Sequence, residues 1–321
     1  LTAKYGEAKV SLPGGCAIGA RPVNFHIDAL KQMGVSVAVE EGYIHAKVKS
    51  KLQGAAILFP EVTVTGTENI LMVAAFAEGK TTLENAACEP EVVALGEFLQ
   101  SAGAIIEGLG TSEITITGGT LRVPAAPVRI RPDRIETGTW MAVAAATRSE
   151  LTLVDTDASQ LLSVIEVFRQ MGARVDVSPD GTRITVVPND TYRAVDIATD
   201  PYPGFATDMQ AQVMAALCMA QGESRIRETI FENRFMHVAE LRRLGAKIEI
   251  HGNEARILGP TLFRGAPVMA TDLRASASLV VAALCAEGET KISRIYHLDR
   301  GYQKLDAKLE RIGGRIRRIA E

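Results

Sequence analysis

The stretch VIEVFRQMGARVDV, residues 164–177, contains the pattern from which most of this sequence is built. Apolar residues recur at helical spacing as far as Met171, a glycine stands at position 172, and apolar and polar residues alternate after it. This pattern predicts an amphipathic helix that ends at the glycine and leads directly into a half-buried strand.

The same pattern occurs five times, with its glycine roughly 70 residues further along each time. The five stretches are residues 27–40, 95–108, 164–177, 238–250 and 305–319. A helix of small residues, a turn and a strand precede each of the last four, in residues 70–86, 140–156, 214–229 and 279–295. This period is too long for a solenoid, so we expect each unit to be a small α/β subdomain with its own sheet.

The helices of small residues are apolar on most faces, so we expect them inside the fold with the strands packed around them. Too few residues precede Gly34 for a complete unit, and no methionine begins the sequence. The sequence therefore predicts a fragment of a longer protein whose first unit is incomplete. Residues 120–136 are proline-rich without helical periodicity, which predicts a linker between domains at 1–130 and 131–321.

Composition bounds the class of protein. The 321 residues are 47% hydrophobic and carry a formal net charge of −3 with no block of like charges, so nothing favours nucleic acid or an anionic membrane as a partner. The longest apolar runs are too short to span a bilayer, and no signal peptide is apparent. Four widely spaced cysteines indicate reduced thiols rather than a zinc cluster, and Cys218 and Cys285 are predicted to be core residues.

The loop LPGGCAIGARP, residues 12–22, places Cys16 among glycines with Arg21 five residues later. If the loop folds back, the arginine lowers the pKa of the thiol, which can then act as an acid or a nucleophile. The alternative is a flexible turn with an incidental cysteine.

Three arginines recur at turns or helix starts, each with an acidic residue nearby. They are Arg234 in FENRFMHV, Arg274 in ATDLRASAS and Arg300 in YHLDRGY. Guanidinium groups suit phosphate and carboxylate, which predicts an anion site; the alternative is surface pairing with Asp272 and Asp299.

One aspartate has two possible roles. Asp208 in FATDMQAQ holds the place that Asp272 holds in MATDLRAS, so it is either a helix cap or a base. His237 and His297 have no partner at metal-ligand spacing, and we expect them to be structural or supporting. No Walker or dinucleotide glycine motif is present in the sequence.

Six motifs in order together resemble one family. The motifs are SLPGGCAIGARPV, RIETGT, ATDMQAQ, FENRFMHV, ATDLRASAS and RIYHLDRGY. They closely resemble the UDP-N-acetylglucosamine 1-carboxyvinyltransferases, the enolpyruvyl transferases of bacterial peptidoglycan synthesis. The cysteine loop favours this family over the sister 5-enolpyruvylshikimate-3-phosphate synthases. The resemblance implies an α/β fold of two inside-out barrels built from βαβαββ-type units, with substrates bound between domains that close on them.

The resemblance also implies a reaction. The 3′-hydroxyl of UDP-N-acetylglucosamine adds to C2 of phosphoenolpyruvate while C3 is protonated, and phosphate then leaves as C3 loses a proton. It implies that Cys16 protonates C3, can form an adduct with phosphoenolpyruvate and is alkylated by fosfomycin. It further implies that Asp208 accepts the hydroxyl proton and that Arg300 senses closure. The implied substrate-binding residues are Arg21, Pro22, Val23, Asn24, Phe25, Val62, Thr63, Val64, Thr65, Thr207, Ile230, Phe231, Arg234, Asp272 and Arg274.

The resemblance implies no cofactor, no metal and a place in the bacterial cytoplasm, with a role in cell-wall growth, cell shape and division. Asn24, Glu61 and Cys88 depart from residues common in the family. The family's first stretch, with a Lys–Asn pair and a further arginine, is not in the sequence, so we expect this chain by itself to be inactive. The alternatives are a shikimate-type transferase and a non-catalytic protein that binds UDP-sugars.

Overall fold

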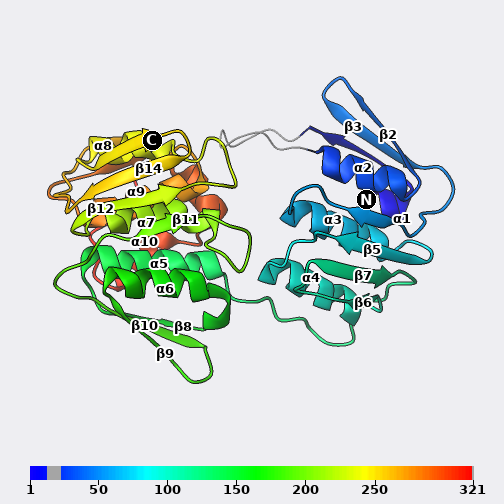
Figure 1. The fold of residues 1–321 in the computed structure, drawn as a ribbon, viewed down its shortest axis with the longest axis horizontal. Helices are drawn as coiled ribbons and strands as arrows, with labels where there is room; N and C mark the ends of the chain where they lie inside the picture. Colours follow the sequence, from blue (N-terminus) through cyan, green and yellow to red (C-terminus); the bar gives the residue numbers. More distant parts are fainter. Residues whose placement is uncertain (13–22, 320–321) are drawn as a thin grey trace. The chain divides into compact units, whose positions relative to one another are not determined.

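The structure is a computed structural model that describes residues 1–12 and 23–319 (Figure 1). The described residues divide into two compact units, one ending at Arg131 and the other beginning at Pro132. Helix α5 (Arg134–Thr147) opens the second unit, and the carboxylate of Asp133 caps it by accepting hydrogen bonds from the amides of Ile135 and Glu136. The linker that the sequence predicts over 120–136 therefore extends too far, because the cap starts a helix within it.

The second unit repeats one arrangement of a sheet around helices. Strands β8 (Leu151–Val154), β10 (Arg183–Val187) and β9 (Arg174–Val177) form a sheet in that order. Its next sheet has the order β11-β12-β14-β13, and the last described one pairs β15 with β16. These strands span Asp196–Ala198, Gly222–Arg227, Glu254–Gly259, Lys247–His251, Pro267–Met269 and Lys291–Ser293.

Three helices of small residues form the centre of this unit. Helices α5, α7 (Gln210–Leu217) and α9 (Leu273–Leu284) contact one another, and every residue of α7 is buried. The outer helices are α6 (Leu162–Met171), α8 (His237–Arg243) and α10 (Leu305–Arg311), with the 3-10 turns η1 (Ala158–Leu161), η2 (Thr207–Met209) and η3 (Ile295–Arg300). The prediction that small-residue helices lie inside and strands outside is confirmed, because small side chains let three helices approach closely.

The first unit shows the complete repeat once. It runs β4 (Ala56–Leu58), α3 (Val64–Ala74), β5 (Lys80–Glu84), α4 (Pro90–Ser101), β6 (Ile105–Glu107) and β7 (Glu113–Thr117), with the sheet order β4-β5-β7-β6. Strand β4 pairs in parallel with β5, and the other pairs are antiparallel. This is the βαβαββ unit that the resemblance implies. The short strands β4, β11 and β15, which open the units, are too brief to be recognised by periodicity.

The elements before β4 make a three-stranded antiparallel sheet. They are α1 (Thr2–Tyr5), β1 (Glu7–Ser11), α2 (Asn24–Gln32), β2 (Val35–Glu40) and β3 (Tyr43–Val48), with the sheet order β1-β3-β2. The side chain of His26 on α2 lies 3.1 Å from that of Asn69 on α3, measured from Nδ1 to Nδ2.

The five repeated glycines behave as their positions predict. Gly172 follows α6 with a φ of 109°, and the equivalent glycines after α2, α4, α8 and α10 also have positive φ. Glycine takes this left-handed backbone without the steric penalty that a side chain brings, so the chain can leave the helix and enter a strand.

One expectation for the end of the chain is wrong. The sequence predicts a strand after Gly313, but residues 314–319 form no strand in the part of the chain that the structure describes. Arg318 in this segment instead makes ion pairs with Asp299 and Asp306. None of the helices in the described ranges combines the length and the apolar character that crossing a membrane requires.

Candidate active site

One carboxylate in the second unit holds two arginines. Asp208 lies in η2, directly before α7. Its Oδ1 atom accepts a hydrogen bond from Nη2 of Arg234 at 2.7 Å, and its Oδ2 atom accepts from Nε of Arg274 at 2.9 Å. Arg234 stands in the turn before α8, and Arg274 is in the first turn of α9. The fold thus joins three segments that are far apart in the sequence.

The two arginines are nearly buried, whereas the carboxylate that joins them faces solvent in part. The exposed fraction of the side chain is 6% for Arg234, 13% for Arg274 and 39% for Asp208. Desolvation acts to raise the pKa of Asp208, but the charges and hydrogen bonds of Arg274 and Arg234 outweigh it and hold that pKa below its ordinary value. With two guanidinium groups and one carboxylate, the cluster therefore carries a net positive charge at neutral pH.

A buried network of polar side chains binds Arg274 and Asp208 of this cluster. Nη1 of Arg274 lies 3.3 Å from the hydroxyl of Tyr302, and that hydroxyl lies 2.8 Å from Oγ1 of Thr139 on α5. The side-chain amide of Gln212 on α7 donates to the Tyr302 hydroxyl, to Thr139 Oγ1 and to the backbone oxygen of Asp208. Because one side chain from each of the three central helices takes part, the network fixes Arg274 and Asp208 to the centre of the unit.

Asp208 and Asp272 play different parts although the sequence gives them the same place. Asp272 is buried and caps α9, its Oδ1 atom accepting hydrogen bonds from the amides of Arg274 and Ala275. The side chain of Asp208 makes no cap hydrogen bond, since the N-cap of η2 is Ala206. The alternative that Asp208 is a helix cap is therefore wrong, and so is the alternative that Arg274 pairs at the surface with Asp272.

Thr207, Ile230 and Phe231 donate hydrogen bonds to one buried acid that no sequence pattern indicated. Glu228, which follows β12, accepts hydrogen bonds from the hydroxyl of Thr207 and from the backbone amides of Ile230 and Phe231. The guanidinium carbon of Arg234 lies 5.2 Å from the centre of the Phe231 ring. No local sequence pattern distinguishes a single glutamate at the end of a strand. Glu228 can therefore be recognised only from the hydrogen-bond donors that the fold brings to it.

His237 is a buried, neutral residue near Arg234 and Asp272. It is 1% exposed, and burial lowers its pKa to about 4; the nearby carboxylate of Asp272 opposes this change, and Arg234 adds to it. The imidazole is thus uncharged at neutral pH and cannot serve as an acid there. This agrees with the supporting role that the sequence predicts.

Comparison with known proteins places this arrangement in a family. The sequence pattern of the family described as EPSP synthase (3-phosphoshikimate 1-carboxyvinyltransferase) matches residues 1–309. The UDP-N-acetylglucosamine 1-carboxyvinyltransferase of Desulfosudis oleivorans is 54% identical over 319 residues, which cover 99% of this chain and 76% of that protein. The same-named protein of Paramagnetospirillum magneticum is 51% identical over 321 residues, covering 100% and 74%. The chain belongs to the UDP-N-acetylglucosamine 1-carboxyvinyltransferase family.

Solved structures agree with this family fold. The enolpyruvyl transferase NikO from Streptomyces tendae superposes with a TM-score of 0.86 at 27% identity, covering 99% of this chain and 75% of that one. An EPSP synthase from Acinetobacter baumannii superposes with a TM-score of 0.70 at 19% identity, covering 94% and 73%, and shows the likeness of fold alone. The α/β fold of two inside-out barrels is thereby confirmed.

Several residues that the family resemblance implicates belong to other segments of the chain. Cys16, Arg21 and Pro22 lie outside the described residues. In the first unit, Val23 and Thr63 are the N-cap residues of α2 and α3, and the Thr63 hydroxyl accepts a hydrogen bond from the amide of Gly66 at 3.2 Å. The remaining implicated residues of this unit are Asn24 and Phe25 on α2, Val62 before α3, and Val64 and Thr65 on α3.

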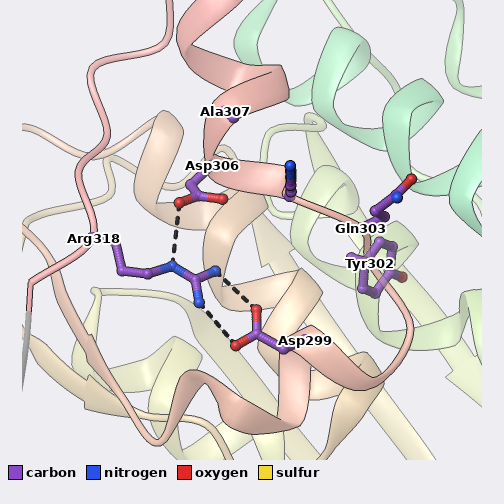
Figure 2. A pocket seen from close by; sticks show the side chains of 7 residues that line it. Asp299, Tyr302, Gln303, Asp306, Ala307 and Arg318 are labelled. Carbon is purple, nitrogen blue, oxygen red and sulfur yellow. Dashed lines mark hydrogen bonds and ion pairs between the residues drawn. The ribbon is translucent and has the colours of Figure 1, made fainter.

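Arg300, which the family resemblance also implicates, is the last residue of η3. The residue before it, Asp299, lines a cavity of about 470 Å³. Figure 2 shows the side chain of Arg318 between Asp299 and Asp306 at this cavity, with Tyr302 nearby. The Arg318 guanidinium donates two hydrogen bonds to Asp299, at 2.8 and 2.9 Å, and one to Asp306, at 3.2 Å. The sequence offers a surface pair of Asp299 with the adjacent Arg300 as an alternative. In the structure, the Asp299 carboxylate pairs with Arg318.

The described cysteines do not suit nucleophilic chemistry. Cys218 is fully buried and Cys285 packs at the edge of the core, as the sequence predicts. Desolvation raises the pKa of both thiols to about 12 and raises that of Cys88 as well. Since the thiolate is the reactive form, these three side chains are inert at neutral pH.

Proposed function

We propose that the protein to which this chain belongs, rather than this chain by itself, carries out the reaction for which its family is named. It transfers the enolpyruvyl group of phosphoenolpyruvate to the 3′-hydroxyl of UDP-N-acetylglucosamine and releases phosphate. The relatives' names support this assignment at 51–54% identity. The observation in the structure that supports it best is the single carboxylate of Asp208, partly exposed and held between two nearly buried arginines.

The carboxylate of this cluster suits one requirement of the reaction, and its two arginines suit another. In the addition step, the 3′-hydroxyl oxygen bonds to C2 of phosphoenolpyruvate, C3 gains a proton, and the hydroxyl proton passes to the Asp208 carboxylate. In the elimination step, C3 loses a proton, the double bond returns and the C2–O bond to phosphate breaks. Arg234 and Arg274 are suited to bind the anionic groups of phosphoenolpyruvate, because guanidinium forks match carboxylate and phosphate oxygens.

The finer assignments belong to the same proposal. Cys16 donates the proton to C3 and is the site of fosfomycin alkylation. Arg21 holds phosphate, and Arg300 responds to closure. The first unit binds the nucleotide through residues 23–25 and 62–65, and the second through Thr207, Ile230 and Phe231. The two units are the two domains of the enzyme, divided near residue 130. The enzyme acts in the bacterial cytoplasm on the committed step of peptidoglycan synthesis and so affects cell shape and division.

The test is phosphate release by the full gene product that contains this chain. Phosphoenolpyruvate is supplied with UDP-N-acetylglucosamine in one arm and with shikimate 3-phosphate in the other, and Asp208→Asn is the inactive reference. We expect release with the UDP-sugar only, and mass spectrometry should find the fosfomycin adduct on Cys16. Release with the shikimate compound alone would assign the chain to the other reaction. Binding of the UDP-sugar without any release would instead support a non-catalytic sugar-binding protein.

A further inference from the structure

We propose that Glu228 is a positioning residue that sets the spacing between the turn carrying Asp208 and the loop carrying Arg234. The kinetic part of this inference rests on the proposed function, whereas its structural part does not. Glu228 is only 3% exposed and follows the last residue of β12. In the part of the chain that the structure describes, Glu228 forms no ion pair with Asp208, Arg234 or Arg274, so its influence must pass through the groups that it binds.

The carboxylate of Glu228 joins two different segments. Its Oε2 atom accepts a hydrogen bond from the hydroxyl of Thr207 at 2.9 Å. Its Oε1 atom accepts from the amides of Ile230 at 2.9 Å and Phe231 at 3.2 Å, and from the hydroxyl of Thr199 at 3.0 Å. One oxygen thus holds the start of η2 and the other holds the loop after β12. We call this set of contacts the Glu228 staple.

A carboxylate is the side chain best suited to this place. All four donors are neutral N–H or O–H groups, and an ionised carboxylate offers about four acceptor sites with no donor of its own. A buried donor without an acceptor has lost its hydrogen bonds to water and gained none in return, so the pattern specifies an acceptor of this length.

The backbone of Glu228 is itself fixed to the sheet. Its amide donates to the backbone oxygen of Asn253 at 2.8 Å, and the side-chain amide of Asn253 donates back to the Glu228 backbone oxygen at 3.1 Å. The next amide, that of Thr229, donates to Oγ1 of Thr199 at 2.8 Å. The Glu228 staple is therefore anchored to the turn between β13 and β14 and to the segment after β11, and it cannot move freely with either segment that it holds.

Both segments end in residues of the candidate site. Thr207 directly precedes Asp208, and the ring of Phe231 lies beside the guanidinium of Arg234. The ion pair of Asp208 with Arg234, at 2.7 Å, joins the same two segments at the site itself. The Glu228 staple and this ion pair are thus two links between one turn and one loop. Without the staple, the ion pair would be the remaining one of these two links.

Three substitutions of Glu228 separate the effect of its side-chain length from the effect of its charge. Glu228→Gln keeps the length: its oxygen can still accept from the loop amides, and its NH₂ group can donate to Thr207. Glu228→Asp keeps the charge but is one methylene shorter and cannot reach both segments. Because a misplacement of about 1 Å can reduce turnover about 100-fold, we expect Glu228→Asp and Glu228→Ala to lose about 100-fold in kcat and Glu228→Gln to stay within about threefold. Activity in the aspartate variant with loss in the glutamine variant would overturn the proposal, since the charge would then be what matters.

A matched pair of threonine variants controls for lost stability. Thr199→Val and Thr207→Val each remove one hydroxyl donor to the same carboxylate. We expect both to lower the unfolding temperature, but only Thr207→Val, which frees the turn before Asp208, to lower kcat. Equal kcat values in these two variants would show that the contacts serve stability alone.

Amide hydrogen exchange of the ligand-free protein tests the staple without the reaction. The amides of Ile230 and Phe231 should exchange at least about tenfold faster in Glu228→Asp and Glu228→Ala than in the wild type, while those of β12 stay protected. Unchanged exchange at these two amides would refute the staple whatever the enzyme does. Faster exchange in a protein that releases no phosphate would uphold the staple and contradict the proposed function.

Discussion

Replacing Asp208 with asparagine should destabilise the second unit as well as slow turnover. The substitution keeps the size of the side chain and removes the charge that compensates Arg234 and Arg274. These arginines are 6% and 13% exposed, so they would remain as two poorly solvated cations close to one another. An asparagine oxygen can still accept a hydrogen bond, but it cannot neutralise them.

The magnitude follows from the burial of the cluster. Removing one member of a buried ion pair costs about 3–5 kcal/mol. The Asp208 side chain is 39% exposed, so water screens part of the interaction and we expect a loss of about 2–3 kcal/mol in the free energy of unfolding. For a unit of this size, that loss lowers the unfolding temperature by about 5–10 °C. If Asp208 is the general base, kcat should fall by about 10²–10⁴-fold.

The stability difference should depend on pH in one direction. The pKa of Asp208 is depressed in the folded state below its ordinary value of 3.8. A depressed carboxyl stabilises the fold fully above its unfolded pKa and loses this contribution as pH falls through the folded pKa. The wild type should therefore exceed Asp208→Asn in stability from neutral pH down to about 4, and the two should converge below that.

Calorimetry of the wild type and Asp208→Asn at several pH values measures this difference. The matched control is Asp176→Asn, which removes an acid paired with Arg174 where both side chains are more than half exposed. The control should change stability by less than about 0.5 kcal/mol. If Asp208→Asn is as stable as the control at pH 7, the argument from buried arginines is wrong.

Three further predictions concern other parts of the second unit. Because the pKa of His237 is about 4 in the fold and 6.5 in the unfolded chain, the unfolded state binds the extra proton first, and acidification from pH 7 to 5 should destabilise the wild type by about 2 kcal/mol. In His237→Gln, the free energy of unfolding measured in urea should not fall in this way between pH 7 and 5. An equal fall in both proteins would contradict the prediction. Gly172→Ala, at a φ of 109°, should lose about 1–2 kcal/mol in thermal unfolding, whereas Gly119→Ala, in open space without positive φ, should be neutral. Arg318→Gln should lose about 1 kcal/mol at low salt and much less in 1 M NaCl, because its partners are partly exposed; a loss unaffected by salt would rule out the ionic explanation.

The repeat is the part of this protein that the sequence by itself determined. Helical spacing, a glycine and alternation lie within about fourteen residues, so each helix–strand unit can be recognised locally, and Gly172 and its equivalents take the left-handed backbone that they predict. The burial of α7 and its neighbours follows from composition alone, because helices without a polar face have no side to turn to water. The strand expected after Gly313 fails, since a local pattern cannot supply a pairing partner.

The roles of individual site residues were decided only by the tertiary structure. Asp208 and Asp272 occupy the same place in neighbouring repeats, yet one holds two arginines and the other caps a helix. The partners of Asp208 stand 26 and 66 residues away, and those of Glu228 include Thr207 on another element. The chemistry of a carboxylate depends on which donors and charges surround it, and those neighbours are brought together by packing over distances that no local pattern spans.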